Sequence, residues 1–217
     1  MSEREPIRGP GPHRQPTARS YVDSTLGAAS VGGGAVWLIV GAQAAGKSTV
    51  AELLARTFDR SVHVRGGAFY RIAVRGWVHH DDPKTDQARR HLDLRYRLSA
   101  LAADEYAAEG FTVVAQDNIY GSDVTSWLPR VRARPRFLVV LRPSVSVIER
   151  RERERFVATG KVAYRAGGVT ASDLDRALGA TARVGLWLDT SKMTAPESVD
   201  EILRRCHEAE IVDGGEA

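Results

Sequence analysis

Residues 41–48 read Gly41-Ala42-Gln43-Ala44-Ala45-Gly46-Lys47-Ser48, a glycine-containing stretch that ends in a Lys-Ser pair. An apolar and β-branched run, residues 36–40, precedes this stretch. Residues 49–56 follow it and carry apolar side chains at helical spacing. The stretch is therefore expected to lie where a buried strand turns into an amphipathic helix.

This spacing and this context match the Walker A phosphate loop at every specified position. Glycines allow backbone N–H groups to approach phosphates closely, and the N-terminus of the following helix adds partial positive charge. We expect Lys47 to reach the outer phosphates and the Ser48 hydroxyl to hold Mg²⁺, so the expected cofactors are ATP and Mg²⁺. The residues expected to bind the nucleotide are Gly41, Ala42, Gln43, Ala44, Ala45, Gly46, Lys47, Ser48 and Thr49.

Composition indicates one soluble α/β domain. The chain has 217 residues, of which 43% are hydrophobic and 27% charged, and no apolar run approaches the length of a membrane span. A single cysteine, Cys206, excludes an intramolecular disulfide, so we expect a cytoplasmic protein in which Cys206 packs a C-terminal helix. Residues 1–30 are rich in Pro, Gly, Ser and Arg and lack a secretory signal pattern. They predict a disordered tail before a domain at residues 31–217.

The chain carries a formal net charge of +4 and has a pI of about 9.4. A basic balance permits a nucleic-acid partner, but arginines also suit a protein that handles phosphates. No RNA-binding signature and no Lys/Arg run with interleaved aromatics is present. Nucleotide binding is therefore favoured over nucleic-acid binding, while the oligomeric state stays open.

Strand patterns alternate with helix patterns along the chain. Strands are predicted at residues 36–40, 61–64, 111–115, 136–141 and 185–190. Helices are predicted at residues 49–56, 84–109, 121–131, 143–155 and 172–182, and from Pro196 onward. In the long helix, Leu94, Leu98 and Leu101 are expected on the apolar face. This alternation implies parallel βαβ units in a doubly wound sheet, with ligands at the carboxyl ends of the strands.

Further stretches extend the pattern beyond the phosphate loop, namely His63-Val64-Arg65-Gly66, residues 111–117 and residues 185–191. With these, the chain resembles the small P-loop kinases of the adenylate, shikimate and gluconate kinase type, particularly the chloramphenicol phosphotransferase-like branch. The resemblance covers about residues 35–203. It implies an α/β P-loop NTPase sandwich of three layers with a five-stranded parallel sheet, an acceptor region after the second strand, and a small mobile lid at about residues 156–171.

The resemblance also implies an arginine that closes on the γ-phosphate and stabilises the charge of phosphoryl transfer. Arg151 and Arg155 share a helical face just before the lid, and they are the catalytic candidates beside Lys47. The alternative is a solvated helix in which glutamates pair with these arginines at a spacing of three or four residues. Both interpretations stay open here.

One position departs from the branch. Where relatives usually carry an Asp suited to deprotonate the acceptor hydroxyl, this chain has Gly67. Asp117, at the end of the third strand, is the best placed replacement, because a carboxylate there can organise Mg²⁺ through water or orient the nucleophile. The alternative for Asp117 is a local turn or cap ahead of Gly121-Ser122.

Other conspicuous residues have structural explanations. The stretch His79-His80-Asp81-Asp82 predicts a polar loop rather than a metal cluster, and Trp37 and Trp187 are expected to pack strands. Phe69, Tyr70 and Trp77 are slightly more typical of packing than of an acceptor pocket. Arg65 fits an acceptor-binding residue and a surface arginine equally well.

The expected activity is therefore transfer of the ATP γ-phosphate to a hydroxyl of a small metabolite or antibiotic. The alternative is an ATP-binding module without transferase activity that signals through a partner. A GTPase is disfavoured because no Asn-Lys-x-Asp segment is present.

Overall fold

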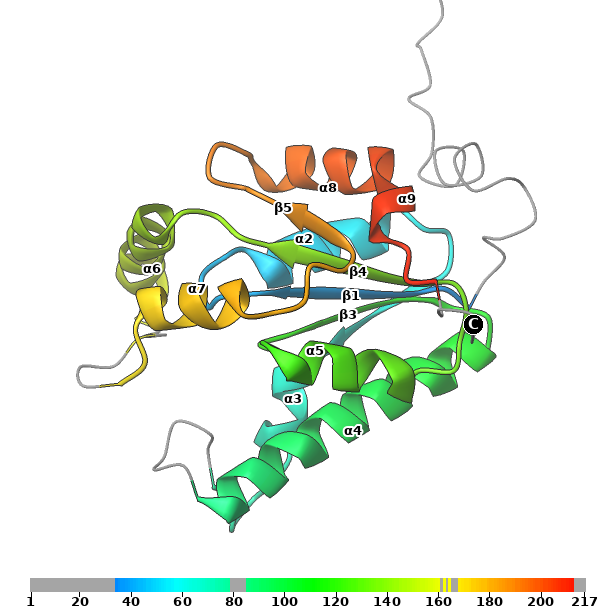
Figure 1. Ribbon diagram of the computed structural model, residues 1–217, viewed down its shortest axis with the longest axis horizontal. Helices are drawn as coiled ribbons and strands as arrows, with labels where there is room; N and C mark the ends of the chain where they lie inside the picture. Colours follow the sequence, from blue (N-terminus) through cyan, green and yellow to red (C-terminus); the bar gives the residue numbers. More distant parts are fainter. Residues whose placement is uncertain (1–33, 79–84, 161, 163, 165–167, 213–217) are drawn as a thin grey trace, which may run out of the picture.

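The computed structural model describes residues 34–78, 85–160, 162, 164 and 168–212. A five-stranded parallel sheet with the order β2-β3-β1-β4-β5 lies between two layers of helices (Figure 1), so the predicted fold class is confirmed. The strands are β1 Val36–Gly41, β2 Ser61–Arg65, β3 Thr112–Asp117, β4 Arg136–Leu141 and β5 Leu186–Leu188. The helices include α2 Lys47–Arg56, α3 Gly66–Arg71, α4 Asp86–Ala108, α5 Ser122–Trp127, α6 Val145–Thr159, α7 Ala171–Gly179, α8 Ala195–Arg204 and α9 Cys206–Ala209, with a 3₁₀ turn, η1, at Leu128–Arg130.

The central strands are buried on both faces. Every residue of β1 and β4 is buried, which explains why β1, and β4 after Arg136, are continuous apolar runs rather than alternating ones. On the face covered by α2, α8 and α9, Trp37 stacks on Phe137 with the ring centroids 4.0 Å apart, and Cys206 is buried as expected. A second apolar cluster fills the opposite face under α4 and α5. Trp37 thus has the packing role predicted for it.

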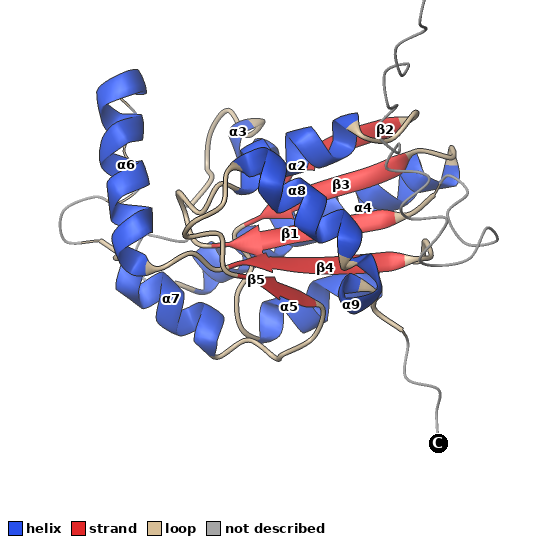
Figure 2. Ribbon diagram, turned by 90° about the horizontal axis from the view of Figure 1, so that it is seen from above, coloured by secondary structure: helices blue, strands red, loops and turns tan. Residues whose placement is uncertain are grey.

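All five strands run in the same direction. Figure 2 shows their carboxyl ends at the side of the molecule where α6 and α7 lie. At β1 the strand order reverses, because β1 pairs with β3 on one side and with β4 on the other. Ligands of doubly wound folds bind at such a point, and the loop between β1 and α2 begins there.

Helix boundaries differ from prediction in several places. α4 begins after Thr85, whose side chain accepts a hydrogen bond from the Ala88 N–H. α7 begins at Ala171 rather than near Ser172, because Thr170 and Asp173 form a capping box. The helix predicted at 121–131 is split into α5 and η1.

The apolar face predicted for α4 is wrong. Leu101 is 53% exposed and Leu94 and Leu98 are only half-buried, whereas Ser99, Ala103 and Ala107 are among the buried residues. Small residues form the buried stripe because α4 packs closely on the sheet, and their low hydropathy hid it from a pattern based on leucines.

The predicted lid, at about residues 156–171, overlaps the end of α6. α6 continues to Thr159, so residues 156–159 belong to the helix. The predicted tail at residues 1–30 and the His79–Asp82 loop lie outside the described residues.

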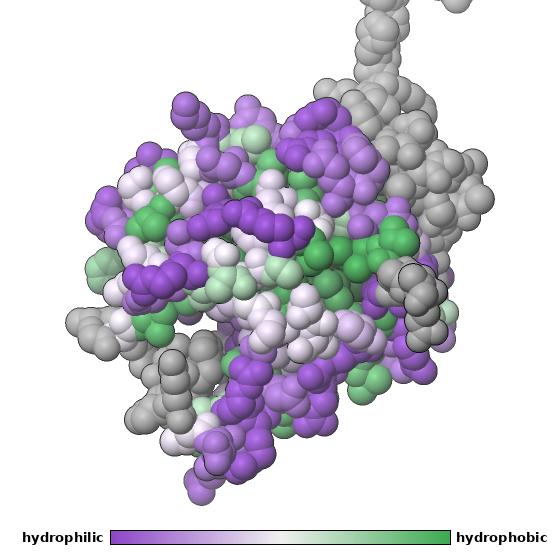
Figure 3. Space-filling view, in the orientation of Figure 1, coloured by the Kyte–Doolittle hydropathy of each residue, from purple (hydrophilic) through white to green (hydrophobic). Residues whose placement is uncertain are grey.

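The outer surface mixes polar and apolar side chains. On the face drawn in Figure 3, hydrophilic residues predominate and a smaller apolar area lies beside α9. Among the residues that the structure describes, no helix combines the length and the apolar character needed to cross a membrane.

Candidate functional site

The phosphate loop has a backbone that requires its glycines. Gly41 has a φ of 155°, and a Cβ there would lie 2.5 Å from the Leu141 carbonyl oxygen. Gly46, the N-cap of α2, has a φ of 97°, and Ala44 between them also adopts a left-handed conformation with a φ of 63°. Left-handed residues in a tight loop direct successive N–H groups toward one concave side, which is the geometry of an anion site.

Lys47 is buried beneath this loop. Its side chain is 7% exposed, and its Nζ donates a hydrogen bond of 2.7 Å to the Ala42 carbonyl oxygen. Burial lowers the pKa of Lys47 to about 7, while Asp117 opposes this and Arg155 and Arg95 add to it. A bound polyphosphate would stabilise the ammonium form, because it would place negative charge beside it.

Asp117 is the last residue of β3 and is 6% exposed. Its Oδ1 accepts hydrogen bonds from Arg95 Nη2 at 2.9 Å and from the Asn118 N–H at 2.7 Å. Its Oδ2 has no hydrogen-bond partner among the described residues and faces the Cα of Gly66. Burial raises the pKa of Asp117, and the Arg95 guanidinium opposes that rise. Asp117 therefore faces the turn where the acceptor region was predicted.

Sequence reasoning missed Arg95. This arginine is 3% exposed on α4, and its guanidinium joins Asp117 at the end of β3. It lies four residues before Ser99 on the buried stripe of small residues. The spacing of four residues from Ser99 is the signal that could have identified Arg95, because an arginine on a buried stripe needs an acidic partner.

The arginines of α6 separate into two groups. Arg151 donates from Nη1 to the Ala45 carbonyl oxygen at 3.2 Å and from Nη2 to the Thr190 carbonyl oxygen at 2.9 Å. Arg155 instead pairs with Glu152, and Arg150 pairs with Glu154. Of the two catalytic candidates, Arg151 contacts the phosphate loop directly. Arg155 makes the helical ion pair of the alternative interpretation and also lies close enough to affect Lys47.

Two tyrosines that sequence reasoning did not single out also contact the loop. Tyr120 Oη donates to the Gly41 carbonyl oxygen at 3.2 Å, and Tyr164 Oη donates to the Gln43 carbonyl oxygen at 2.8 Å. No pattern in the sequence marks them, because they reach the loop from 79 and 121 residues away.

Ser48 and Thr49 are exposed in the first turn of α2. No group of three or more His, Cys, Asp or Glu side chains able to hold a metal was found in the described part of the chain. The residues nonetheless fit a nucleotide-bound Mg²⁺, since an exposed hydroxyl follows the buried Lys47 and phosphate oxygens supply the other ligands. Asp117 fits a role through water, because Arg95 and Asn118 already use its Oδ1.

The side chain of Arg65 is 52% exposed and pairs with Glu52 at 3.3 Å. Of the two interpretations of Arg65, an acceptor-binding residue or a surface arginine, this arrangement fits the surface arginine. Tyr70 and Trp77 lie side by side with centroids 6.3 Å apart, and Trp77 stacks on His91. Phe69 and Trp187 are both half-buried and pack against the same apolar cluster, and Trp187 also lies under the Arg183 guanidinium.

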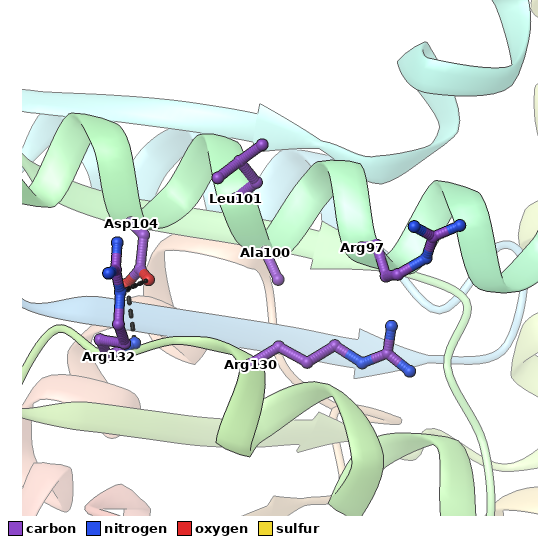
Figure 4. Close-up of a pocket in the computed structure, with 6 residues that line it drawn as sticks. All are labelled: Arg97, Ala100, Leu101, Asp104, Arg130 and Arg132. Atoms are coloured by element: carbon purple, nitrogen blue, oxygen red, sulfur yellow. Dashed lines mark hydrogen bonds and ion pairs between the residues drawn. The ribbon is translucent and has the colours of Figure 1, made fainter.

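A separate hollow of about 440 Å³ lies between α4 and the segment that contains η1 (Figure 4). Its Asp104 accepts hydrogen bonds from the N–H groups of Arg132 and Ala133 and pairs with the Arg132 side chain. This hollow adjoins the chain leading into the start of β4, whereas the phosphate loop follows the end of β1. The Asp104 carboxylate stabilises the turn at Arg132 and Ala133, so we do not place phosphoryl transfer in this hollow.

Solved structures with a similar architecture include kinases and a resistance protein. An unliganded sugar kinase from Janibacter sp. HTCC2649 is 19% identical with a TM-score of 0.56, over 80% of this chain and 95% of that one. A gluconokinase from Sinorhizobium meliloti 1021 is 20% identical with a TM-score of 0.52, over 78% and 89%. A tunicamycin resistance protein from Deinococcus radiodurans is 15% identical with a TM-score of 0.53, over 82% and 98%. At these identities the likeness shows the fold, which is that of P-loop kinases.

The family model described as AAA domain matches residues 36–177, and the chain belongs to this family. No curated protein matches the sequence.

Proposed function

We propose that this protein is an ATP-dependent kinase that transfers the γ-phosphate of ATP to a hydroxyl of a small molecule, a metabolite or an antibiotic. The observation that carries the proposal is the buried Lys47 beside Asp117 at the carboxyl edge of the sheet. Burying an ammonium is costly unless a ligand or partner stabilises it, and a polyphosphate in the adjoining loop would do so.

Each candidate has a role in this reaction. The loop N–H groups and Lys47 would bind the phosphates and neutralise charge that develops during transfer. Ser48 would hold Mg²⁺, which supplies further charge neutralisation on the phosphates. Arg151 would fix the loop and the segment after β5, through the Ala45 and Thr190 carbonyl oxygens that it contacts. Arg155 of α6 would add positive charge near Lys47 and the bound phosphates.

We propose that Asp117 orients the acceptor hydroxyl rather than deprotonating it. Its Oδ1 is held by Arg95 and Asn118, and these two contacts oppose the rise in the pKa of Asp117 that burial causes, which limits its strength as a base. The Oδ2 atom is buried against Gly66 and has no partner among the described residues, so it would accept a hydrogen bond from a hydroxyl or a water once the acceptor turn opens to admit one.

Lys47→Ala tests the proposal. MgATP would be incubated with panels of hydroxylated metabolites and antibiotics, and phosphoryl addition would be scored by mass spectrometry. We expect an acceptor to be phosphorylated by the unaltered protein and not by the variant. Arg204→Ala, on the exposed side of α8, is the matched control and should keep full activity. Undiminished transfer by the Lys47 variant would contradict the proposal.

A second candidate, an ATP-binding module without transferase activity, is favoured by one observation. The acceptor turn carries Gly66 and Gly67 instead of an acid, and Asp117 is committed to Arg95. A Cβ on Gly67 would meet only Tyr70 Cε1, at 3.6 Å, so Gly67→Asp should fold. Acceptor phosphorylation that appears only in this variant would support the module, and strong phosphorylation by the unaltered protein would exclude it.

A further inference from the structure

The carbonyl groups of the phosphate loop are held by side chains from three separate parts of the chain. Tyr120, between β3 and α5, donates to the Gly41 carbonyl oxygen at 3.2 Å. Tyr164, within the predicted lid, donates to the Gln43 carbonyl oxygen at 2.8 Å. Arg151 of α6 donates to the Ala45 carbonyl oxygen at 3.2 Å. Alternate carbonyls of the loop thus each receive a donor from outside the loop.

Peptide planarity gives these contacts a consequence for the phosphate side. In a trans peptide the carbonyl oxygen of one residue and the N–H of the next point in opposite directions. Fixing the Gln43 and Ala45 carbonyl oxygens therefore fixes the N–H groups of Ala44 and Gly46. Ala44 has a positive φ of 63°, a conformation that costs energy in a residue other than glycine, so contacts that fix its peptide favour the shape of the loop.

Both tyrosine hydroxyls remain donors at neutral pH. Burial raises the pKa of Tyr164 and of Tyr120 above the ordinary value, with Glu152 adding to the rise at Tyr164 and Tyr164 itself adding to that at Tyr120. A protonated hydroxyl that donates to a backbone carbonyl is a stable arrangement in a partly buried site.

We infer that Tyr120 and Tyr164 are positioning residues that hold the phosphate loop in its binding shape. Neither residue contacts phosphate, because each holds the side of the peptide that faces away from it. The inference rests on the proposed function in one respect, since it assumes that a nucleotide occupies the loop.

The test uses Tyr164→Phe and Tyr120→Phe in the full chain, since phenylalanine keeps the ring and removes only the hydroxyl. Tyr106→Phe is the matched control, because Tyr106 is 46% exposed on α4 and packs edge-on against Phe111. Affinities for MgATP and MgADP would be measured by calorimetry. We expect each of the first two variants to bind about fivefold more weakly, the effect of one neutral hydrogen bond, and the control to bind like the unaltered protein.

Hydrogen exchange of the nucleotide-free protein separates positioning from general destabilisation. In Tyr164→Phe, faster exchange confined to the amides of residues 42–46 is expected, whereas faster exchange throughout the domain would overturn the inference. Affinity equal to that of the unaltered protein would also overturn it. Weaker binding by the variants in a protein that phosphorylates no acceptor would support the inference and would count against the kinase proposal alone.

Discussion

Gly66 and Gly67 are adjacent but differ in the space around their Cα atoms. A Cβ on Gly66 would collide with the Asp117 carboxylate, while a Cβ on Gly67 would make an ordinary contact with Tyr70. Both lie in the first turn of α3. Gly66 is thus required by the position of Asp117, and Gly67 is not required by packing.

This difference predicts opposite effects of two alanine substitutions. Gly66→Ala should lower the free energy of unfolding by roughly 1 to 3 kcal/mol, the usual cost of overpacking, because Asp117 must move. Gly67→Ala should be neutral or stabilise by up to about 1 kcal/mol, since alanine is the better helix former. Chemical denaturation of both variants measures the effect. Equal losses at the two positions would show that Asp117 does not confine Gly66.

At the scale of elements, α6 links the phosphate loop to the segment after β5. Arg151 makes this link through two carbonyl oxygens, and Ser144, at the N-cap of α6, donates its N–H to Ser191 Oγ at 2.8 Å. α6 therefore contacts both segments that border the site.

Arg151→Gln should weaken MgATP binding by about tenfold or more, because hydrogen bonds from a charged donor are worth about 1.5 to 3 kcal/mol. Arg150→Gln is the control on the same helix. Arg150 is 57% exposed and lies 3.7 Å from Glu154, and such surface pairs contribute little. Titration calorimetry compares the two variants. Similar MgATP affinities of the two variants would show that Arg151 does not contribute to nucleotide binding.

A second link joins α2 to β2. The His63 side chain is 8% exposed, and its Nδ1 lies 2.9 Å from Glu52 Oε2. Burial lowers the pKa of His63 below the ordinary value, even though Glu52 opposes this. On acidification below about pH 6.5, the unfolded chain therefore gains a proton at His63 that the folded chain does not, so stability falls.

His63→Gln should remove this part of the acid sensitivity. Melting temperatures of the unaltered protein and the variant would be compared between about pH 7.5 and 5.5, on either side of the histidine pKa. We expect the unaltered protein to lose more stability over this range. Parallel curves would mean that His63 keeps the same proton affinity when the chain folds.

At the scale of the whole molecule, the sheet could be predicted well from the sequence. β1, and β4 after Arg136, are continuous apolar runs because both faces are covered, and the glycines and Lys-Ser pair define the loop between β1 and α2. The surroundings of that loop could not be predicted. Arg95 reaches Asp117 beside the loop and Tyr164 reaches the loop itself, each from a distant segment that only the tertiary structure brings there.

The two helices on either side of residues 160–170 are each held by contacts with segments that leave the sheet. α6 is held through Arg151, and α7 is held by Arg142, at the end of β4, which binds both carboxylate oxygens of Asp175. The free energy needed to close a loop between fixed ends rises by only about 0.6 kcal/mol for each doubling of its length. Insertions between Gly168 and Val169, which are both exposed and lie beyond the Tyr164 contact with the phosphate loop, should therefore cost little stability.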